Sequence, residues 1–328
     1  MKDLIEGVSR IEIPTPFPVG SVNCYVIEGS PLTLIDTGPK NSKSLATIQK
    51  ELHARSYSLG DIEQILLTHG HTDHIGLAAK FVAERAQTHD KPTEVWIHQK
   101  DAMAVVNYDR YADLYLEFYE ELITSSGVPQ KELPTLPPKR LLEYFKSLLD
   151  PVPTALSFND GAIFKTGIGE VTAVWVPGHS SGSACYVCDE QKIIFSGDFI
   201  LGDISSNPSI SFDRSEKIGM ITYLESLNRL SSRESYVALP GHREPILDIK
   251  SRIKVLRAEY DDKLRNAANS LTNTPQTVYD ISRIIYGDYD TNSLILALAE
   301  SHDLLRILEG RNQAKLTRKD AVVYATKQ

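Results

Sequence analysis

The chain has 328 residues, which is enough for one large domain or for a domain with a smaller extension. Its 43 acidic and 35 basic side chains give a net charge of −8 at pH 7, which disfavours long-range attraction to nucleic acid. The N-terminus is too charged for a signal peptide and no segment has the roughly 18 apolar residues of a membrane span, so we expect a cytoplasmic protein without membrane contact.

The first third of the chain alternates strand-like and helix-like segments. Apolar runs of four to eight residues indicate strands, and apolar residues three or four positions apart indicate helices. The alternation predicts a hairpin over 22–36, a helix from Ser42 or Ser44 to about His53, a strand over 62–68 that ends at His69, a helix from Ile75 to Ala86, and a strand over 93–99.

Residues 100–150 interrupt this alternation with a mostly helical insertion bounded by proline-rich pieces. A β-rich second half follows. Two β-rich halves, each with its own helices, predict a sandwich of two sheets with helices on the outside. The expected elements of the second half are strands over 161–167, 170–178, 183–189, 192–198 and 235–241, and a helix near 214–230.

The pattern changes to helices after Pro245. We expect a long helix over about 246–270 with one apolar stripe, two more helices near 277–286 and 292–309, and a hairpin over 314–327. Three helices and a hairpin resemble a winged helix. The sequence therefore predicts a first part, 1–245, and a C-terminal, winged-helix-like part, 246–328.

Residues 68–76, THGHTDHIG, place three histidines and an aspartate within six positions, directly after a predicted strand. Metal ligands cluster in sequence only where the backbone turns tightly, as it does at the carboxyl end of a strand. His69 and His71 can reach one ion from the same side of such a loop, and Asp73 and His74 can turn towards a second. We interpret the segment as half of a paired metal site.

Three further donors each follow a predicted strand and a glycine. They are His179 in VWVPGH, Asp198 in IIFSGD and His242 in YVALPGH. The strands of one sheet edge would bring these donors to the 69–74 loop.

The combination H-x-H-x-D-H followed by a distant His, Asp and His resembles the metallo-β-lactamase-fold hydrolase superfamily. The resemblance covers residues 1–245 and implies an α+β, αββα sandwich. It also implies that His69, His71 and His179 hold one metal, that Asp73, His74 and His242 hold a second, and that Asp198 bridges them. The cofactors would be two Zn²⁺ ions, with Fe or Mn as alternatives.

Two zinc ions would lower the pKa of a bridging water towards about 7, and the resulting hydroxide would attack a carbonyl or phosphoryl centre. Asp73 and Asp198 are the expected catalytic carboxylates. We predict a hydrolase of a small acyl substrate (thioester, lactone or ester). An endoribonuclease or other phosphodiesterase, a mononuclear iron dioxygenase, a decayed site and a non-catalytic interaction protein stay open as alternatives.

Two residues differ from those in other branches of the family and argue against the reactions of those branches. True β-lactamases of this fold generally lack the bridging aspartate, so Asp198 argues against antibiotic cleavage. Flavodiiron relatives carry a glutamate at the position of His71 and a flavodoxin domain, which argues against oxygen reduction here.

Two surface patterns bear on the substrate. Tyr108, Tyr111, Tyr115, Phe118, Tyr119 and Leu122 recur at helical steps, so they either form core or line a pocket over the metal site. Lys250, Lys254 and Arg257 form one side of a helix and could contact RNA or simply face solvent. From residue 270 onward, however, seven basic and seven acidic residues balance. A small molecule is therefore the expected partner, and the oligomeric state is open.

The remaining polar residues receive structural interpretations. Cys185 and Cys188 form a CxxC, but residues three apart on a strand point to opposite faces, so we expect buried thiols and no shared metal. Asp36 either steadies the ligand loops or only starts a turn. We expect surface or core positions for the histidines without a partner pattern, His53, His89, His98 and His302.

Overall fold

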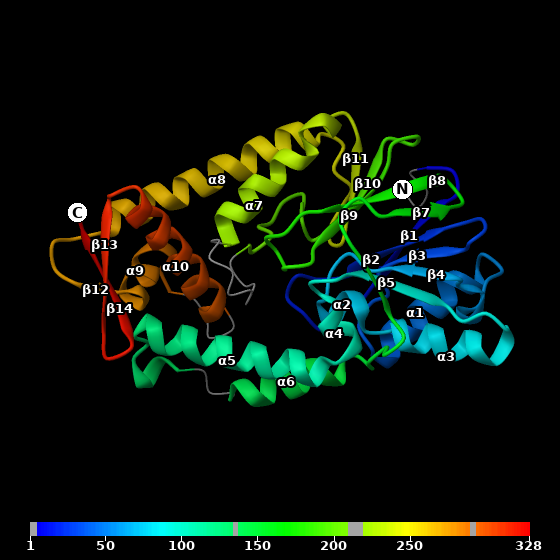
Figure 1. The fold of residues 1–328 in the computed structure, drawn as a ribbon, viewed down its shortest axis with the longest axis horizontal. Helices are drawn as coiled ribbons and strands as arrows, with labels where there is room; N and C mark the ends of the chain where they lie inside the picture. The colour runs from blue at the N-terminus through cyan, green and yellow to red at the C-terminus, as the bar shows by residue number, and fades with distance from the viewer. Residues whose placement is uncertain (1–4, 134–136, 209–218, 289–292) are drawn as a thin grey trace.

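The computed structural model describes residues 5–133, 137–208, 219–288 and 293–328. Two sheets lie against each other with helices on their outer faces, which confirms the αββα, α+β prediction (Figure 1). A helical insertion and a C-terminal part lie together at the other end of the molecule.

The first sheet has six strands in chain order, with β1 to β3 antiparallel and β3 to β6 parallel. They are β1 (Val8–Ile13), β2 (Val22–Ile27), β3 (Thr33–Ile35), β4 (Gln64–Leu66), β5 (Glu94–His98) and β6 (Leu156–Phe158). The second sheet has the order β11, β10, β9, β8, β7, and only β10 and β11 are parallel neighbours. They are β7 (Ile163–Thr166), β8 (Gly169–Trp175), β9 (Ala184–Cys188), β10 (Ile193–Gly197) and β11 (Val237–Pro240).

Ten α-helices lie in the described ranges. They are α1 (Ser42–His53), α2 (Thr72–Ile75), α3 (Ala78–Thr88), α4 (Ala102–Val106), α5 (Tyr108–Ser126), α6 (Pro138–Ser147), α7 (Gly219–Leu227), α8 (Ile249–Ser270), α9 (Val278–Tyr286) and α10 (Leu294–Gly310). Short 3₁₀ turns cover Leu59–Asp61, Gln130–Glu132 and Asn228–Arg233. Within these ranges every helix is too short or too polar to cross a membrane.

Three buried apolar clusters explain the layering. One fills the space between the sheets, with Tyr25, Tyr186 and Phe195 fully buried in it. A second packs α1 and α3 on the outer face of the first sheet, and a third packs α7 and α8 on the outer face of the second sheet. Side chains of β9 alternate between the inner and outer clusters, as the period of a strand requires.

The C-terminal part is continuous with this core. The apolar stripe predicted on the long helix is buried except for the half-buried Ile253, and the cluster around it extends from β8 to β14. A three-stranded sheet, β12 (Gln276–Thr277), β14 (Val322–Lys327) and β13 (Ala314–Lys319), closes this end. The division at residue 245 and the winged-helix assignment stay predictions.

The structure corrects several local predictions. Asn41, and not Ser42 or Ser44, caps α1, because its extended backbone lets Oδ1 accept from the Ser44 amide. The helix predicted from Ile75 to Ala86 is broken, since the Leu77 amide donates to the Gly38 carbonyl instead of continuing α2. The strands β1, β6 and β12 were not predicted from the sequence. Residues 214–218 and 292, parts of two predicted helices, lie outside the described residues.

Candidate metal centre

The HxHxDH segment follows β4 and forms a tight loop that runs into α2. His71 is the residue before the helix, in extended conformation, so His69 and His71 lie on the loop while Asp73 and His74 lie on the first turn. The strands β3 and β4 are parallel, and β8, β10 and β11 run in one direction in the other sheet, so their carboxyl ends meet at one edge. This explains why donors far apart in sequence come together.

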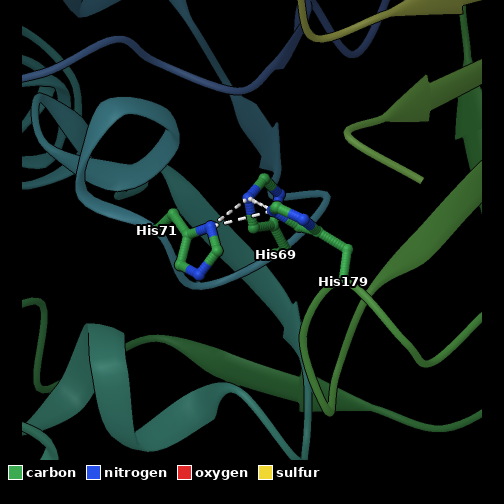
Figure 2. Close-up of side chains that lie close together, drawn as sticks. All are labelled: His69, His71 and His179. Carbon is green, nitrogen blue, oxygen red and sulfur yellow. Dashed lines mark hydrogen bonds between the residues drawn. The ribbon is translucent and has the colours of Figure 1, made fainter. Parts of the chain in front are cut away.

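Three imidazole nitrogens converge on one point (Figure 2). Nε2 of His69 lies 3.0 Å from Nδ1 of His71, and Nε2 of His179 lies 3.2 Å and 2.9 Å from these two atoms. Three nitrogens bound at 2.0–2.1 Å to a tetrahedral zinc would be about 3.3 Å apart. The spacing in the structure is therefore close to that of a three-histidine metal site.

A second group lies beside the first. Nε2 of His242 is 3.4 Å from Oδ2 of Asp73 and 3.4 Å from Oδ2 of Asp198, and Nε2 of His74 is 3.5 Å from Oδ1 of Asp198. Asp198 Oδ2 also lies 3.7 Å from Nε2 of His179. Asp198 thus lies beside donors of both groups, and all seven sequence-predicted donors meet in one place.

Unsatisfied atoms show that this arrangement suits a cation. Within the described residues, four buried side-chain atoms have no hydrogen-bond partner. Three of them are Nε2 of His74, Nε2 of His242 and Oδ1 of Asp198. Leaving a buried polar atom unpaired costs about 1–3 kcal/mol, and a metal ion would remove that cost for all three at once.

The opposite nitrogens of four histidines are held by oxygen atoms, which fixes the rings. His74 Nδ1 lies 2.8 Å from Oδ2 of Asp36, and the same carboxylate accepts from the Thr68 amide and hydroxyl. The other three contacts are His69 Nδ1 with the Thr68 hydroxyl at 3.1 Å, His179 Nδ1 with the Ser206 carbonyl at 2.5 Å, and His242 Nδ1 with the Ser21 carbonyl at 2.8 Å. Asp36 therefore steadies the ligand loops.

The protonation states divide the site into two halves. Burial, and then repulsion between protonated imidazoles at His71 and His179, lowers the pKa of His71 to about 3. Burial also lowers the pKa of His69 and His179. Burial alone would lower the pKa of His242. The nearby Asp198 carboxylate has the larger effect in the opposite direction and raises this pKa to about 10. The first group therefore offers neutral imidazoles, whereas the carboxylates of the second group attract positive charge, which in the metal-free protein is the proton on His74 and on His242.

Gly241, directly before His242, is required for steric reasons. A Cβ on Gly241 would lie 2.4 Å from Oδ1 of Asp198 and 2.7 Å from Cε1 of His74. Only glycine lets the backbone after β11 pass this close to the other donors.

The structure adds one important residue that the sequence analysis missed, Asp101. This buried carboxylate accepts from the Gly70 amide at 2.9 Å, the Gly182 amide at 2.7 Å and the Ser180 hydroxyl at 2.6 Å. It thus joins the loop of His71 to the loop of His179. The local sequence HQKDAMAVV gives no signal for this role, because an aspartate directly before an apolar helical run is typical of a helix start.

A cavity opens beside the first group. Its inner end is formed by residues 70–73, and its sides by six apolar or aromatic residues: Phe17, Tyr108, Tyr111, Tyr115, Leu142 and Phe145. The aromatic stripe of α5 therefore has two roles. Its first three tyrosines line the cavity, whereas Phe118, Tyr119 and Leu122 pack against the C-terminal helices.

The basic side of α8 is engaged in structural contacts. Lys250 pairs with Glu234 at 2.9 Å, and Arg257 donates to the Leu224 carbonyl and the Asn228 side chain. Glu234 thus partly neutralises Lys250, and the hydrogen bonds of Arg257 hold its guanidinium against the protein.

The two cysteines of the CxxC and the four histidines without a partner pattern lie outside the donor clusters. Cys185 and Cys188 are buried in different apolar clusters, so the CxxC does not form a shared site. His98 stacks on Trp175, and His302 lies 3.0 Å from the Ser126 hydroxyl. His89 contacts the Thr88 hydroxyl, and His53 is exposed at the end of α1.

The fold and the donor set define a metal-dependent hydrolase. The chain belongs to the metallo-beta-lactamase superfamily, whose sequence model matches residues 17–242. This result confirms the resemblance drawn from the histidine motif.

Comparison with curated proteins gives two informative relatives. The chain is 27% identical over 307 residues to the probable metallo-hydrolase YqjP of Bacillus subtilis (strain 168), covering 93% of this chain and 92% of the relative. It is 26% identical over 300 residues to the atrochrysone carboxyl ACP thioesterase nsrC of Aspergillus novofumigatus, covering 87% and 72%. The chain is thus similar to proteins named as a metallo-hydrolase and a thioesterase.

Two solved structures share the fold along nearly the whole chain. The metallo-beta-lactamase family protein TTHA1429 from Thermus thermophilus has a TM-score of 0.83 and 22% identity, covering 99% of this chain and 100% of that one. A beta-lactamase domain protein from Burkholderia ambifaria has the same TM-score and identity, covering 99% and 94%. Both likenesses include the insertion and the C-terminal part.

Proposed function

We propose that the chain is a two-metal hydrolase of small acyl compounds, with thioesters as the foremost substrates. The observation that carries the proposal is the convergence of seven donors in two groups that share Asp198, next to an apolar cavity. The similarity to a fungal thioesterase supports the acyl class.

The residues divide naturally between two cations. His69, His71 and His179 would hold one, and Asp73, His74 and His242 would hold the other, with Asp198 between them. His and Asp ligands suit zinc, and also Fe or Mn. When bound, such cations would supply a water of lowered pKa and polarise the carbonyl of the substrate.

The side chains of the protein provide the remaining functions. The pKa of Asp198 is well below its usual range: burial opposes this, but the charges of His242 and His74 dominate. Its carboxylate is therefore ionised at neutral pH and can accept a hydrogen bond from the attacking water. Asp73 is ionised as well, since nearby His74 and His242 outweigh the effect of burial on its pKa. The cavity would hold the acyl group and exclude water around the carbonyl.

The cavity favours an acyl group over a phosphodiester. Its described lining contains aromatic and aliphatic side chains and no lysine or arginine. A nucleic-acid site would need several cationic side chains to contact phosphates. We propose a small-molecule partner on this basis, and a cytoplasmic location remains a prediction.

One observation favours RNA cleavage as the second candidate. The C-terminal elements follow the order helix, strand, helix, helix, strand, strand, from α8 to β14, and the final pair forms a hairpin. This order resembles a winged helix, a common nucleic-acid-binding unit.

The test uses metal content and a substrate panel. We expect close to two ions per chain by elemental analysis, and hydrolysis of thioesters that Asp198→Ala abolishes. The exposed Asp203→Ala is a matched control, because its side chain lies on the following loop and pairs only distantly with Arg243.

Other outcomes would identify the alternatives. One iron per chain would favour the dioxygenase, and cleavage of structured RNA without thioester turnover would favour the nuclease. A metal-loaded protein without turnover of any substrate would favour an interaction protein.

A further inference from the structure

The sides of the cavity beside the metal centre are built from two pairs of aromatic rings. Phe17 and Phe145 meet edge to face with their ring centres 5.8 Å apart. Tyr108 and Tyr111 have ring centres 5.4 Å apart and an interplanar angle of 32°. Both pairs line the same cavity, although they come from the N-terminal loop, α5 and α6.

A cavity lined by aromatic side chains favours ligands that contain an aromatic ring. Aromatic groups prefer offset-stacked or edge-to-face neighbours at centre distances of 4.5–7 Å. A planar ring in this cavity would have such neighbours on more than one side, whereas a flexible alkyl chain would lose conformational entropy to fit the same space.

The volume limits the ligand to about one ring. The cavity holds about 190 Å³. An engineered apolar cavity of about 150 Å³ in another protein binds benzene, so the present one can hold a six-membered ring with a short linker. A long acyl chain or a fused polycycle would extend into solvent.

The position of the metal donors along the cavity determines the orientation of the ligand. Among the described lining residues, the two candidate metal donors, His71 and Asp73, mark the end of the cavity at the metal centre. The carbonyl would therefore point inward and the ring outward between Phe17, Phe145 and the tyrosines. A largely aromatic lining without lysine or arginine offers a second anionic group on the ring no counter-charge, which disfavours such a group.

We propose that the acyl group of the substrate carries a single uncharged aromatic ring close to its carbonyl, as in a phenylacetyl thioester. The inference rests on the proposed acyl hydrolysis and specifies its substrate class. In the reaction the oxygen of water bonds to the acyl carbon and the carbon–sulfur bond breaks. One proton of the water passes to the departing sulfur, so the products are the ring-bearing carboxylic acid, here phenylacetic acid, and a thiol.

The experiment compares N-acetylcysteamine thioesters of acetic, hexanoic and phenylacetic acids with the metal-loaded full chain. Each kcat/KM is divided by the rate constant of the same thioester with hydroxide in solution, which removes differences in intrinsic reactivity. We expect phenylacetyl to exceed acetyl by roughly tenfold or more, because ring burial removes a large apolar area from water. We also expect it to exceed hexanoyl by roughly threefold or more, because the ring is rigid.

Two variants connect the preference to this cavity. Leu142→Trp should fill the space and lower the normalised kcat/KM for phenylacetyl far more than that for acetyl, a selective change that misfolding could not produce. Phe145→Leu should lower the preference by raising KM. The matched control is Tyr144→Leu, because Tyr144 is the neighbouring aromatic position on α6 but is 43% exposed and does not line the cavity.

The outcomes separate this inference from the proposed function. Hydrolysis of acetyl or hexanoyl thioesters with equal or higher normalised kcat/KM than phenylacetyl would overturn the ring preference and leave acyl hydrolysis intact. A phenylacetyl preference that Leu142→Trp leaves unchanged would also overturn it. Absence of turnover for all three thioesters would overturn both.

Discussion

The carboxylate of Asp101 accepts a hydrogen bond of 2.7 Å from the amide of Gly182, and a Cβ on that glycine would lie 2.6 Å from the carboxylate carbon. Asp101 follows β5 of the first sheet, Gly182 lies between β8 and β9 of the second, and no side chain would fit between the two residues. Since Asp101 also binds the Gly70 amide, it fixes the distance between the loops of His71 and His179. The geometry of the three-histidine group depends on this carboxylate.

We predict that Asp101→Asn weakens metal binding by about 10–100-fold. Both carboxylate oxygens of Asp101 accept hydrogen bonds, and in asparagine an NH₂ group would replace one of them and would point at a donor. Competition with a chromogenic chelator measures the affinity. Asp150→Asn is the matched control, since Asp150 is exposed and pairs with Lys40 at the surface. Equal affinities for both variants would contradict the role of Asp101.

Removal of metal should destabilise the fold. A ligand at 100 times its Kd stabilises the native state by about 2.7 kcal/mol, and the orphaned atoms of His74, His242 and Asp198 would again lack partners. We expect a lower Tm after chelation and recovery when Zn²⁺ is added back, measured by differential scanning fluorimetry. His179→Ala should show a much smaller shift, and a wild-type Tm that does not respond to chelation would count against a metal centre.

Stability should fall in mild acid because of His302. Burial, and then the charges of Arg306 and Arg318, lower its pKa to about 4 in the folded protein, against about 6.5 in the unfolded chain. The unfolded state therefore binds more protons between these values, so this contribution is complete above pH 6.5 and is lost as the pH falls towards 4. At most about 3 kcal/mol is involved.

Urea unfolding of wild type and His302→Gln at pH 7.5 and pH 4.5 measures this effect. Glutamine can keep a hydrogen bond to Ser126, so we expect the variant to lose less stability in acid than wild type. His53→Gln, at an exposed position, should behave like wild type. The same loss in all three proteins would assign the acid sensitivity to other groups.

The C-terminal helices should support the wall of the cavity. Leu298 on α10 is fully buried with Tyr119 and Leu122 of α5, whereas Leu296 on the same helix is 36% exposed. We expect Leu298→Ala to lower the free energy of unfolding by about 2–5 kcal/mol and Leu296→Ala to change it far less. Denaturant midpoints test the pair. In the folded Leu298→Ala protein, KM for the acyl substrate should rise more than kcat falls, because α5 also carries Tyr108 and Tyr111.

The three cysteines should be unreactive in the native protein. Cys24, Cys185 and Cys188 are all fully buried, and burial raises the pKa of each thiol. Only the thiolate reacts readily, so we expect negligible labelling by a disulfide reagent in buffer and three thiols in guanidinium chloride. Rapid native labelling of Cys185 and Cys188 together would indicate a redox role for the CxxC.

The sequence alone indicated the seven candidate donors, because each of them lies in a segment that follows a strand-like run and histidine and aspartate in that pattern are typical of metal sites. His69, His71, Asp73 and His74 were recognisable from their spacing, and His179, Asp198 and His242 from the repeated glycine-donor ending. Strand alternation also separated Cys185 from Cys188 correctly. The spacing of apolar residues in helices and strands, and the residues that form turns, depend on neighbouring positions in the chain, so the sequence can show both.

Only the tertiary structure decided how these donors are held and what lies beside them. Asp101 and Asp36 resemble ordinary turn residues until contacts across the sheets give them partners, and the single stripe of α5 divides into cavity and core only when α6 and α10 are in place. The physical reason is that a hydrogen bond between loops 81 residues apart, like an apolar surface shared by three helices, depends on packing that no local pattern specifies.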